Sequence, residues 1–299
     1  MEIGFIGLGR MGLNMVKRIV NSGHRVICTA RTDSKKNEAE AVGATWASSY
    51  EDLVKKLSSP RIVWTMVPSG QTTEEVLKAF TGLLEKGDLL IDGGNSDYRD
   101  SIRRTQEISS RHIEFMDVGT SGGIWGLKNG YCLMVGGTKE QVERVKPIFE
   151  ALAPADGWGH VGQVGSGHYV KMVHNAIEYG MMQAYAEGFE LLETSDFQLN
   201  LNQIAALWNK GSVVRSWLLE LVESMFSEDQ HLEGLKGFVD DSGEARWAVE
   251  AAISQGVPVP AMALSLFARF SSRKENAFSN RFLAALRNQF GGHLVHKKE

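Results

Sequence analysis

The stretch "MEIGFIGLGRMGLNMVKRIVNSGHRVICTART", residues 1–32, has the pattern of a strand, a glycine-rich turn, a helix and a second strand. An apolar run over residues 2–7 leads directly into "GLGRMG" at 7–12, and a helical pattern and a second apolar run at 25–30 follow. A G-x-G-x-x-G spacing between a strand and a helix is typical of the first βαβ unit of a dinucleotide-binding sheet. The opening stretch therefore predicts an α/β domain built on a parallel sheet.

Each glycine of this loop has a predicted role. Gly7 permits the tight turn, Gly9 lets a pyrophosphate approach the backbone, and Gly12 lets the helix pack closely on the strand. The helix that follows directs its free amides and its partial positive charge towards the phosphates. A purely structural glycine turn is the alternative. The residues expected to bind the cofactor here are Gly7, Leu8, Gly9, Arg10, Met11 and Gly12.

The second strand ends at "TARTDSKK", residues 29–36. A carboxylate at this place would accept hydrogen bonds from the ribose 2′-hydroxyl of NAD. Arg31 with Thr32 suits the 2′-phosphate of NADP instead, since an arginine fork pairs with phosphate. The residues favour NADP and leave NAD possible through Asp33, and an exposed loop cation is the alternative for Arg31. The loop "MVPSG" at 66–70 is predicted to line the same cofactor through Val67 and Pro68, with a plain proline turn as its alternative.

Strand and helix patterns alternate through the first half of the chain. Further buried strands are predicted at 61–67, 88–94, 113–119 and 131–137, and helices at 12–22, 72–84 and 99–110. The glycine-rich passage at 157–168 is predicted to be a joint, after which only helices are expected, with breaks near 195–200, 228–243 and 256–260. We therefore expect an α/β Rossmann-type N-terminal domain over 1–165 and an all-α domain over 166–299 for substrate binding and oligomerisation.

The composition excludes several classes of protein. With 299 residues, 43% hydrophobic and 23% charged, the chain has the composition of an ordinary soluble globular protein. A net charge of -4 gives nucleic acid no electrostatic reason to bind, and no apolar run is long enough for a membrane span. Cys28 and Cys132 lie in apolar runs, which predicts buried thiols in a reducing compartment. No secretory leader is visible, so the cytoplasm is expected, and no histidine or cysteine spacing predicts a metal.

The stretch "GSGHYVKMVHNAIEYGMMQAYAEGFELL", residues 165–192, places Lys171, His174, Asn175 and Glu178 in one sector of a helix. Lys171 and Glu178 are two turns apart, about 10.5 Å along the axis. This spacing suits a small polar ligand, and a solvated polar stripe is the alternative. The loops "DGGNSDY" at 92–98 and "GTSGGIWG" at 119–126 follow predicted strands and could orient a ligand, although each could also be an ordinary turn.

These motifs together resemble the 6-phosphogluconate dehydrogenases, within the β-hydroxyacid dehydrogenase superfamily. The resemblance rests on "GFIGLGRMG", "ART", "MVPSG", "DGGNS", "DVGTSGG" and the helix at 165–189, and it extends through "SGEARW", "VPVPAMALSLFAR" and "RNQFGGH". It covers essentially the whole chain. It implies oxidative decarboxylation of 6-phospho-D-gluconate, a phosphorylated sugar acid, to D-ribulose 5-phosphate and CO2, a step of the pentose phosphate pathway.

The same resemblance implies a role for individual residues. Lys171 matches the general base and acid of the family, and Glu178 matches its second acid. The sugar acid would be held by Asn95, Ser121, Gly122, Gly123, His174, Asn175 and Tyr179, with Asn95 also near the cofactor. The phosphate end would be held by Arg246, Arg269, Arg287 and His293. Long members of the family usually have a lysine where Arg246 stands, so the positive charge is kept on a different side chain.

The tail of the chain bears on assembly. In the family it reaches into the site of a neighbouring subunit, so a homodimer or homotetramer is expected, with Arg287 and His293 acting within or across subunits. The long members duplicate the helical region, whereas this chain has a single copy.

Two other functions fit part of the sequence. One is a β-hydroxyacid dehydrogenase or reductase of a small unphosphorylated hydroxy acid or aldehyde, which would use Lys171 without decarboxylation. Such a substrate would give Glu178 and the arginines no group to bind or protonate. The other is a nucleotide-sensing regulator that keeps the fold and lacks turnover.

Overall fold

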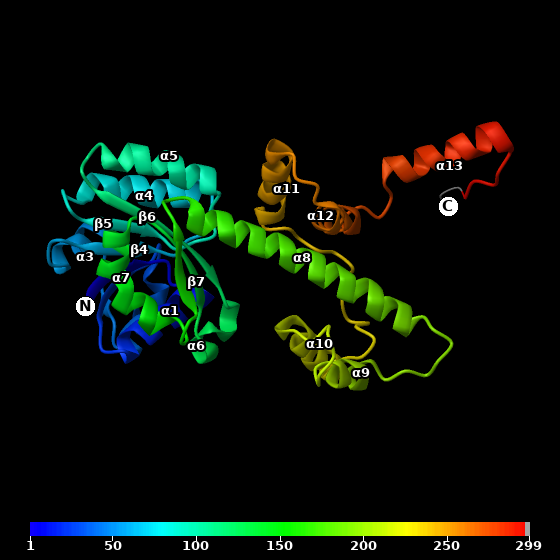
Figure 1. Cartoon of the computed structure of the whole chain (residues 1–299), viewed down its shortest axis with the longest axis horizontal. Coiled ribbons are helices and arrows are strands. Elements are labelled where there is room, and N and C mark those ends of the chain that lie inside the picture. The colour runs from blue at the N-terminus through cyan, green and yellow to red at the C-terminus, as the bar shows by residue number, and fades with distance from the viewer. Residues whose placement is uncertain (297–299) are drawn as a thin grey trace. The chain divides into compact units, whose positions relative to one another are not determined.

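The computed structural model describes residues 1–296 and divides the chain into two compact units, Met1–Asn175 and Ala176–Glu299 (Figure 1). The first unit is an α/β sandwich, and the second consists of helices and their connections. The predicted combination of a Rossmann-type domain and a helical C-terminal part is therefore confirmed.

The first unit is built on a sheet of eight strands in the order β3-β2-β1-β4-β5-β6-β7-β8. Neighbouring strands run parallel except for β6 and β7, which are antiparallel. The central position of β1 between β2 and β4 makes the carboxyl end of β1 the point where the strand order reverses, and ligands of open α/β sheets bind at that point. The strands are β1 (Glu2–Ile6), β2 (Arg25–Thr29), β3 (Thr45–Trp46), β4 (Ile62–Thr65), β5 (Leu89–Asp92), β6 (Glu114–Ser121), β7 (Cys132–Gly136) and β8 (Trp158–Gly162).

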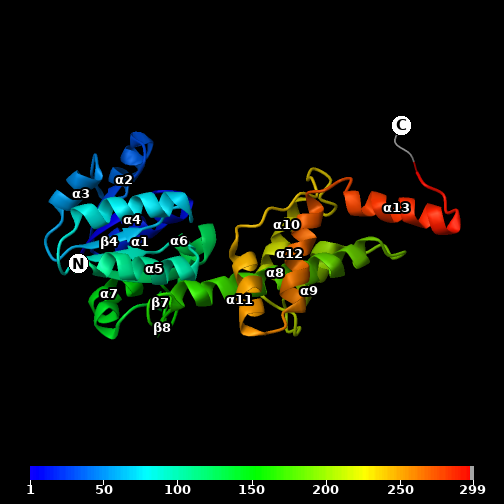
Figure 2. The same ribbon diagram turned by 90° about the horizontal axis from the view of Figure 1, so that it is seen from above.

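Helices cover both faces of this sheet (Figures 1 and 2). Because side chains of a strand alternate between the faces, Trp64 of β4 joins the core under one layer and its neighbour Val63 joins the core under the other. The first layer contains α1 (Arg10–Asn21) and α7 (Lys139–Leu152), and the second contains α3 (Tyr50–Lys56), α4 (Gln71–Leu83) and α5 (Tyr98–Ser109). The shorter elements are η1 (Asp33–Lys35), α2 (Lys36–Ala41), η2 (Gly123–Trp125) and α6 (Gly126–Asn129).

The helix α8 (Ser166–Glu193) begins in the first unit and continues into the second. In the second unit, α9 packs on α10, and α11 packs on α12. Phe189 of α8 and Phe226 of α10 are buried in the small core under α9. The helices are α9 (Leu201–Trp208), α10 (Trp217–Glu228), α11 (Glu244–Gln255), α12 (Pro260–Ser272) and α13 (Phe278–Gly291). No helix in the described part of the chain is long and apolar enough to cross a membrane.

Most of the predicted elements are present, with ends shifted by a few residues. The six predicted strands correspond to β1, β2, β4, β5, β6 and β7, and the three predicted helices correspond to α1, α4 and α5. The predicted breaks separate α8 from α9, α10 from α11 and α11 from α12.

Two sequence predictions were wrong. The passage at 157–168 is not a joint, because it contains β8 and the first turn of α8. The strand β8 is a half-exposed edge strand with few apolar residues, so it has no strong pattern of its own and forms by pairing with β7. Cys132 is exposed, unlike buried Cys28, because it is the first residue of β7 and lies outside the core.

Candidate active site

The loop between β1 and α1 has the geometry that its glycines predict. Gly7 has a φ of 97°, which favours glycine, and a Cβ there would lie 2.2 Å from the carbonyl oxygen of Met66. A Cβ on Gly12 would lie 1.9 Å from the carbonyl oxygen of Gly7, so only glycine lets the helix approach the loop this closely. A Cβ on Gly9 would meet nothing within 4 Å. The backbone at Gly9 is therefore open to a ligand.

The first turn of α1 is free to receive an anion. Gly9 occupies the N-cap and provides no side-chain hydrogen bond, and no acidic residue lies in the first turn. Arg10 is exposed beside it, whereas Leu8 is buried in the core. Free amides at a helix N-terminus with a neighbouring cation fit a pyrophosphate. The residues present thus fit a dinucleotide.

The predicted loop at 66–70 lies beside this turn. The backbone N–H of Met66 donates to the carbonyl of Ile6 at 2.7 Å, and a Cβ on Gly7 would lie 3.0 Å from Val67 Cγ1. Pro68 is exposed, and its carbonyl accepts a hydrogen bond from Thr73 at 2.9 Å. The loop is thus a turn that starts α4 and also lies at the edge where β1 ends.

The end of β2 presents Arg31 to solvent. Arg31 is exposed and makes no hydrogen bond or ion pair with any other described residue. The Thr32 hydroxyl contacts the Ser34 hydroxyl at 2.8 Å, and Lys35 pairs with Glu38 at 2.7 Å. The Arg31 guanidinium is therefore available to bind a ligand, whereas the Lys35 amine is already paired with Glu38.

The loop after β5 carries Asn95, whose Oδ1 is buried and has no hydrogen-bond partner among the described residues. Asp92 holds this loop: its carboxylate accepts from the N–H of Gly94 at 3.1 Å and from the Ser96 hydroxyl at 2.7 Å. Arg104 of α5 is buried and donates to the same carboxylate at 3.0 Å. A buried acceptor without a protein partner on a loop held this firmly indicates a ligand contact.

Lys171 lies on the first turns of α8 and is only 4% exposed. Its Nζ donates to the Asn175 Oδ1 and lies 3.5 Å from the His174 Nδ1. The His174 Nε2 in turn lies 3.5 Å from the Ser121 hydroxyl, at the end of β6. A buried amine therefore lies beside Asn175 and His174 of its own helix, and His174 connects it to Ser121 of β6, as expected for a group that exchanges a proton.

A glycine of β6 lies against the base of the Lys171 side chain. A Cβ on Gly119 would lie 2.4 Å from the Lys171 Cβ, so β6 and α8 approach each other here as closely as glycine allows. Gly122 and Gly123 follow with φ of 124° and 54°, which turns the chain away from β6 directly after Ser121. The structure thus brings together Ser121, His174, Asn175 and Lys171, four of the predicted residues.

The helix continues through Glu178 and Tyr179 in the second unit. Glu178 is half-buried, and Tyr179 is buried. The Tyr179 hydroxyl lies 3.1 Å from the Ser242 hydroxyl, and the Arg269 guanidinium stacks 3.5 Å from the centre of the Tyr179 ring. Arg269 also donates to the Asp240 carbonyl at 2.8 Å. Two of the predicted substrate residues, Tyr179 and Arg269, are therefore in direct contact.

Arg246 is held by a residue that sequence reasoning missed. Its Nε and Nη2 donate to the two carboxylate oxygens of Asp241 at 2.6 and 3.0 Å, and Arg273 donates to the same carboxylate at 2.7 Å. Hydrogen bonds from these arginines lower the pKa of Asp241 to about 2. Since its fork is already paired, Arg246 would have to share or leave Asp241 to bind a phosphate.

Arg287 and His293 lie apart from this group. The helix α13 buries none of its residues, and both side chains are exposed. Within residues 1–296, neither of them makes a hydrogen bond or ion pair to Tyr179, Arg246 or Arg269. Their assignment to the phosphate end remains a prediction.

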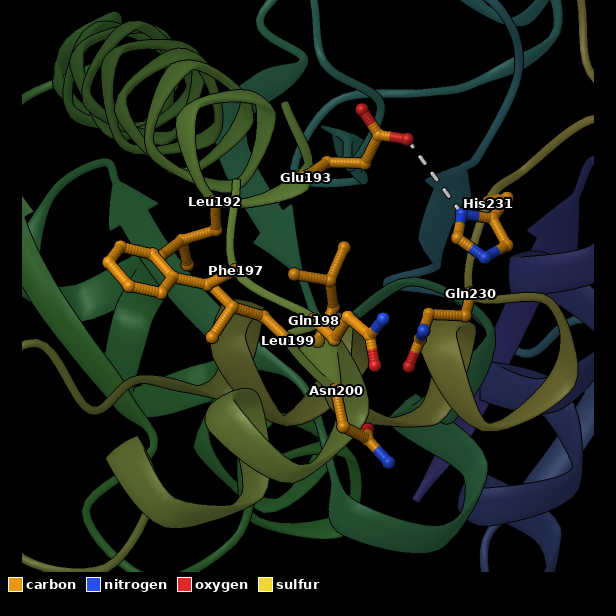
Figure 3. A pocket seen from close by; sticks show the side chains of 9 residues that line it. Leu192, Glu193, Phe197, Gln198, Leu199, Asn200, Gln230 and His231 are labelled. Carbon is orange, nitrogen blue, oxygen red and sulfur yellow. Dashed lines mark ion pairs between the residues drawn. The ribbon is translucent and has the colours of Figure 1, made fainter. Parts of the chain in front are cut away.

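A cavity of about 340 Å³ lies elsewhere in the second unit (Figure 3). Its polar lining includes an ion pair of 3.8 Å between His231 and Glu193. The lining residues are Leu192, Glu193, Phe197, Gln198, Leu199, Asn200, Leu201, Gln230 and His231, none of which was predicted for the site. No cluster of metal-binding side chains is found among the residues that the structure describes.

Comparisons with family models and with curated proteins both relate this chain to the 6-phosphogluconate dehydrogenases. Residues 2–165 match the family model of the NAD-binding domain of 6-phosphogluconate dehydrogenase, and residues 167–277 match the model of its C-terminal domain. YqeC of Bacillus subtilis, provisionally named a 6-phosphogluconate dehydrogenase, is 43% identical over the full length of both chains. An NAD(+)-dependent, decarboxylating 6-phosphogluconate dehydrogenase of Haloferax volcanii is 42% identical, also over both full lengths.

A solved structure supports the same relationship. The 6-phosphogluconate dehydrogenase of Plasmodium falciparum, whose structures include complexes with NADP+ and with 6-phosphogluconate, aligns with a TM-score of 0.83 at 28% identity. The alignment covers all of this chain and 67% of the parasite chain.

Proposed function

The chain belongs to the 6-phosphogluconate dehydrogenase family, and we propose that it converts 6-phospho-D-gluconate to D-ribulose 5-phosphate and CO2 with NADP as the oxidant. The observation that carries the proposal is the buried Lys171 amine, hydrogen-bonded to Asn175 and placed beside His174 and Ser121. The similarity to 6-phosphogluconate dehydrogenases and the loop at 7–12, which fits a dinucleotide, support it further.

The first step is oxidation at carbon 3 of the substrate. Lys171 takes the proton of the carbon 3 hydroxyl while the hydrogen on carbon 3 leaves as hydride, because burial favours the neutral form of an amine over the ammonium. Asn175 orients the amine without placing a negative charge beside it. The bound dinucleotide supplies the hydride acceptor.

The second step is loss of CO2 from the resulting 3-keto acid. Lys171, now an ammonium, donates its proton to the carbon 3 oxygen as the carboxylate leaves, which places positive charge where negative charge develops. Glu178, two helical turns further along α8, then protonates the carbon that lost CO2, which becomes carbon 1 of the product. Lys171 takes the proton back as the carbon 3 hydroxyl of the enediol reverts to the ketone, and the product is D-ribulose 5-phosphate. Return of this proton from Lys171 to the Glu178 carboxylate restores both groups.

The preference for NADP rests on Arg31. Its guanidinium is exposed, has no partner among the described residues, and stands at the end of β2 where the 2′-substituent of the ribose would lie. We expect Arg31→Ala to lower kcat/KM for NADP at least tenfold more than for NAD. Lys36→Ala, an exposed cation five residues further along, should change both values little. Equal losses with both cofactors in the Arg31 variant would contradict this assignment.

The reaction is tested by supplying 6-phosphogluconate with NADP and measuring nicotinamide reduction together with CO2 release. We expect one CO2 per reduced cofactor, near-complete inactivity of Lys171→Met and strong impairment of Glu178→Gln. Lys78→Met, which alters an exposed lysine of α4, serves as the control and should retain activity. Reduction without CO2 release would instead support the dehydrogenase of a small hydroxy acid, and dinucleotide binding without any turnover would support a regulator.

A further inference from the structure

One face of β6 is turned towards α8. Asp117, Gly119 and Ser121 are two residues apart along the strand and therefore lie on the same face of the sheet. Each of them contacts the first turns of α8. The face is thus a three-residue seam along which the helix is docked.

The contacts follow the spacing of the helix. Asp117 accepts the N–H of His168 at 2.7 Å, Gly119 approaches the Cβ of Lys171, and Ser121 lies 3.5 Å from the ring of His174. The helix residues are three apart, so they share one face of α8. Moving two residues along the strand therefore corresponds to moving three residues along the helix. These three contacts together fix the register of α8 on β6.

Asp117 supplies the polar contact that starts this seam. It is fully buried, and its second carboxylate oxygen accepts the N–H of Gly165 at 2.7 Å. Two N–H groups at the start of α8 are therefore capped by a carboxylate from a strand, where the helix dipole favours negative charge. Burial raises the pKa of Asp117, because the charged carboxylate loses its contact with water at this site.

A cap from within the helix would not have the same effect. Ser166 is the first residue of α8, but its hydroxyl is buried and makes no hydrogen bond among the described residues. A local cap would satisfy the amides without holding the helix on the strand. A second side-chain anchor comes from His168, whose Nδ1 contacts the Ser101 hydroxyl of α5 at 2.7 Å.

We propose that Asp117 is a positioning residue, which fixes the register of α8 on β6 and so holds Lys171 beside Gly119 and its neighbour His174 beside Ser121. The proposal rests on the proposed function in taking Lys171 as the proton carrier. The geometry supports it because Asp117, Gly119 and Ser121 belong to one strand, so a shift of the helix at Asp117 moves Lys171 relative to Ser121.

The first test compares Asp117→Asn with the wild type. An asparagine can accept only one of the two N–H groups, so the start of α8 should loosen. We expect kcat with 6-phosphogluconate to fall about tenfold to a hundredfold, the loss typical of small misplacements of a reacting group. Affinity for NADP should stay within about threefold of the wild-type value, because the loop at 7–12 connects β1 and α1 and is not part of β6 or α8. Thr138→Ala removes the cap of α7 and is the control that should leave kcat unchanged.

The second test needs no turnover. Lys171 is labelled with an amine-reactive reagent in the absence of ligands, and the rate is followed by mass spectrometry of the peptide. We expect Asp117→Asn to raise this rate at least tenfold and Thr138→Ala to leave it unchanged. Gly119→Ala, which forces a Cβ against Lys171, should also raise it and replaces Asp117→Asn if that variant does not fold.

Folded Asp117→Asn with unchanged kcat and unchanged labelling would overturn the proposal, and so would equal changes in Thr138→Ala. Should the wild type show no turnover of 6-phosphogluconate, the proposed reaction would fail while the labelling rates would still decide the role of Asp117.

Discussion

Replacing Gly9 separates the folding role of the glycine loop from its binding role. A Cβ at this position meets no heavy atom within 4 Å, and the φ of -68° and ψ of -173° suit alanine. Gly9→Ala should therefore fold normally. The added methyl group, however, would occupy the open space in which a pyrophosphate is expected to approach the backbone.

The magnitudes follow from the geometry. Alanine is a clearly poorer N-cap than glycine, but it also lowers the entropy of the unfolded chain by a comparable amount, so the free energy of unfolding should change by less than about 1 kcal/mol. Moving a phosphate away from even one or two amide donors should weaken NADP binding by at least tenfold, which is about 1.4 kcal/mol. Gly12→Ala is the control variant with the same substitution at a site that has no room for it, because its Cβ would lie 1.9 Å from a carbonyl oxygen. That variant should lose both stability and binding.

The assay is titration calorimetry with NADP, paired with thermal unfolding of the unliganded proteins. We expect Gly9→Ala to keep its melting temperature within about 3 °C, as expected for a change of under 1 kcal/mol in a chain of this size. Unchanged affinity in Gly9→Ala would refute the assignment of the open space to the cofactor. A melting temperature lowered as far as that of Gly12→Ala would refute the steric reasoning.

Two further predictions concern stability and thiol reactivity. The pKa of Asp241 is lowered from 3.8 to about 2, so its ion pairs stabilise the fold above pH 3.8, and this contribution is lost as the pH falls towards 2. Urea unfolding should show Asp241→Asn to be less stable by about 2 kcal/mol at pH 7, with a difference that shrinks below pH 4; a constant difference would contradict the assignment. In the native protein a thiol reagent should modify exposed Cys132 and leave Cys28 unmodified, because burial raises the pKa of the Cys28 thiol to about 12. Modification of Cys28 before unfolding would contradict its placement in the core.

Structural elements with local causes could be predicted from the sequence. The turn at Gly7 needs a residue that tolerates a φ of 97°, and the alternation of apolar runs with helical patterns defines the strands and helices of the first unit. The shared helical face of Lys171, His174 and Asn175 also follows from spacing alone. Each of these signals lies within a few residues of the structure that it predicts.

Contacts between residues far apart in the chain could be identified only in the folded structure. Asp117 and His168 are 51 residues apart in the chain, and Asp241 and Arg273 are 32 apart, so no local pattern marks them as partners. The edge strand β8 and the exposure of Cys132 likewise depend on where neighbouring strands lie. Periodicity and glycine sterics act along the chain, whereas burial and the choice of hydrogen-bond partners are settled by packing across it.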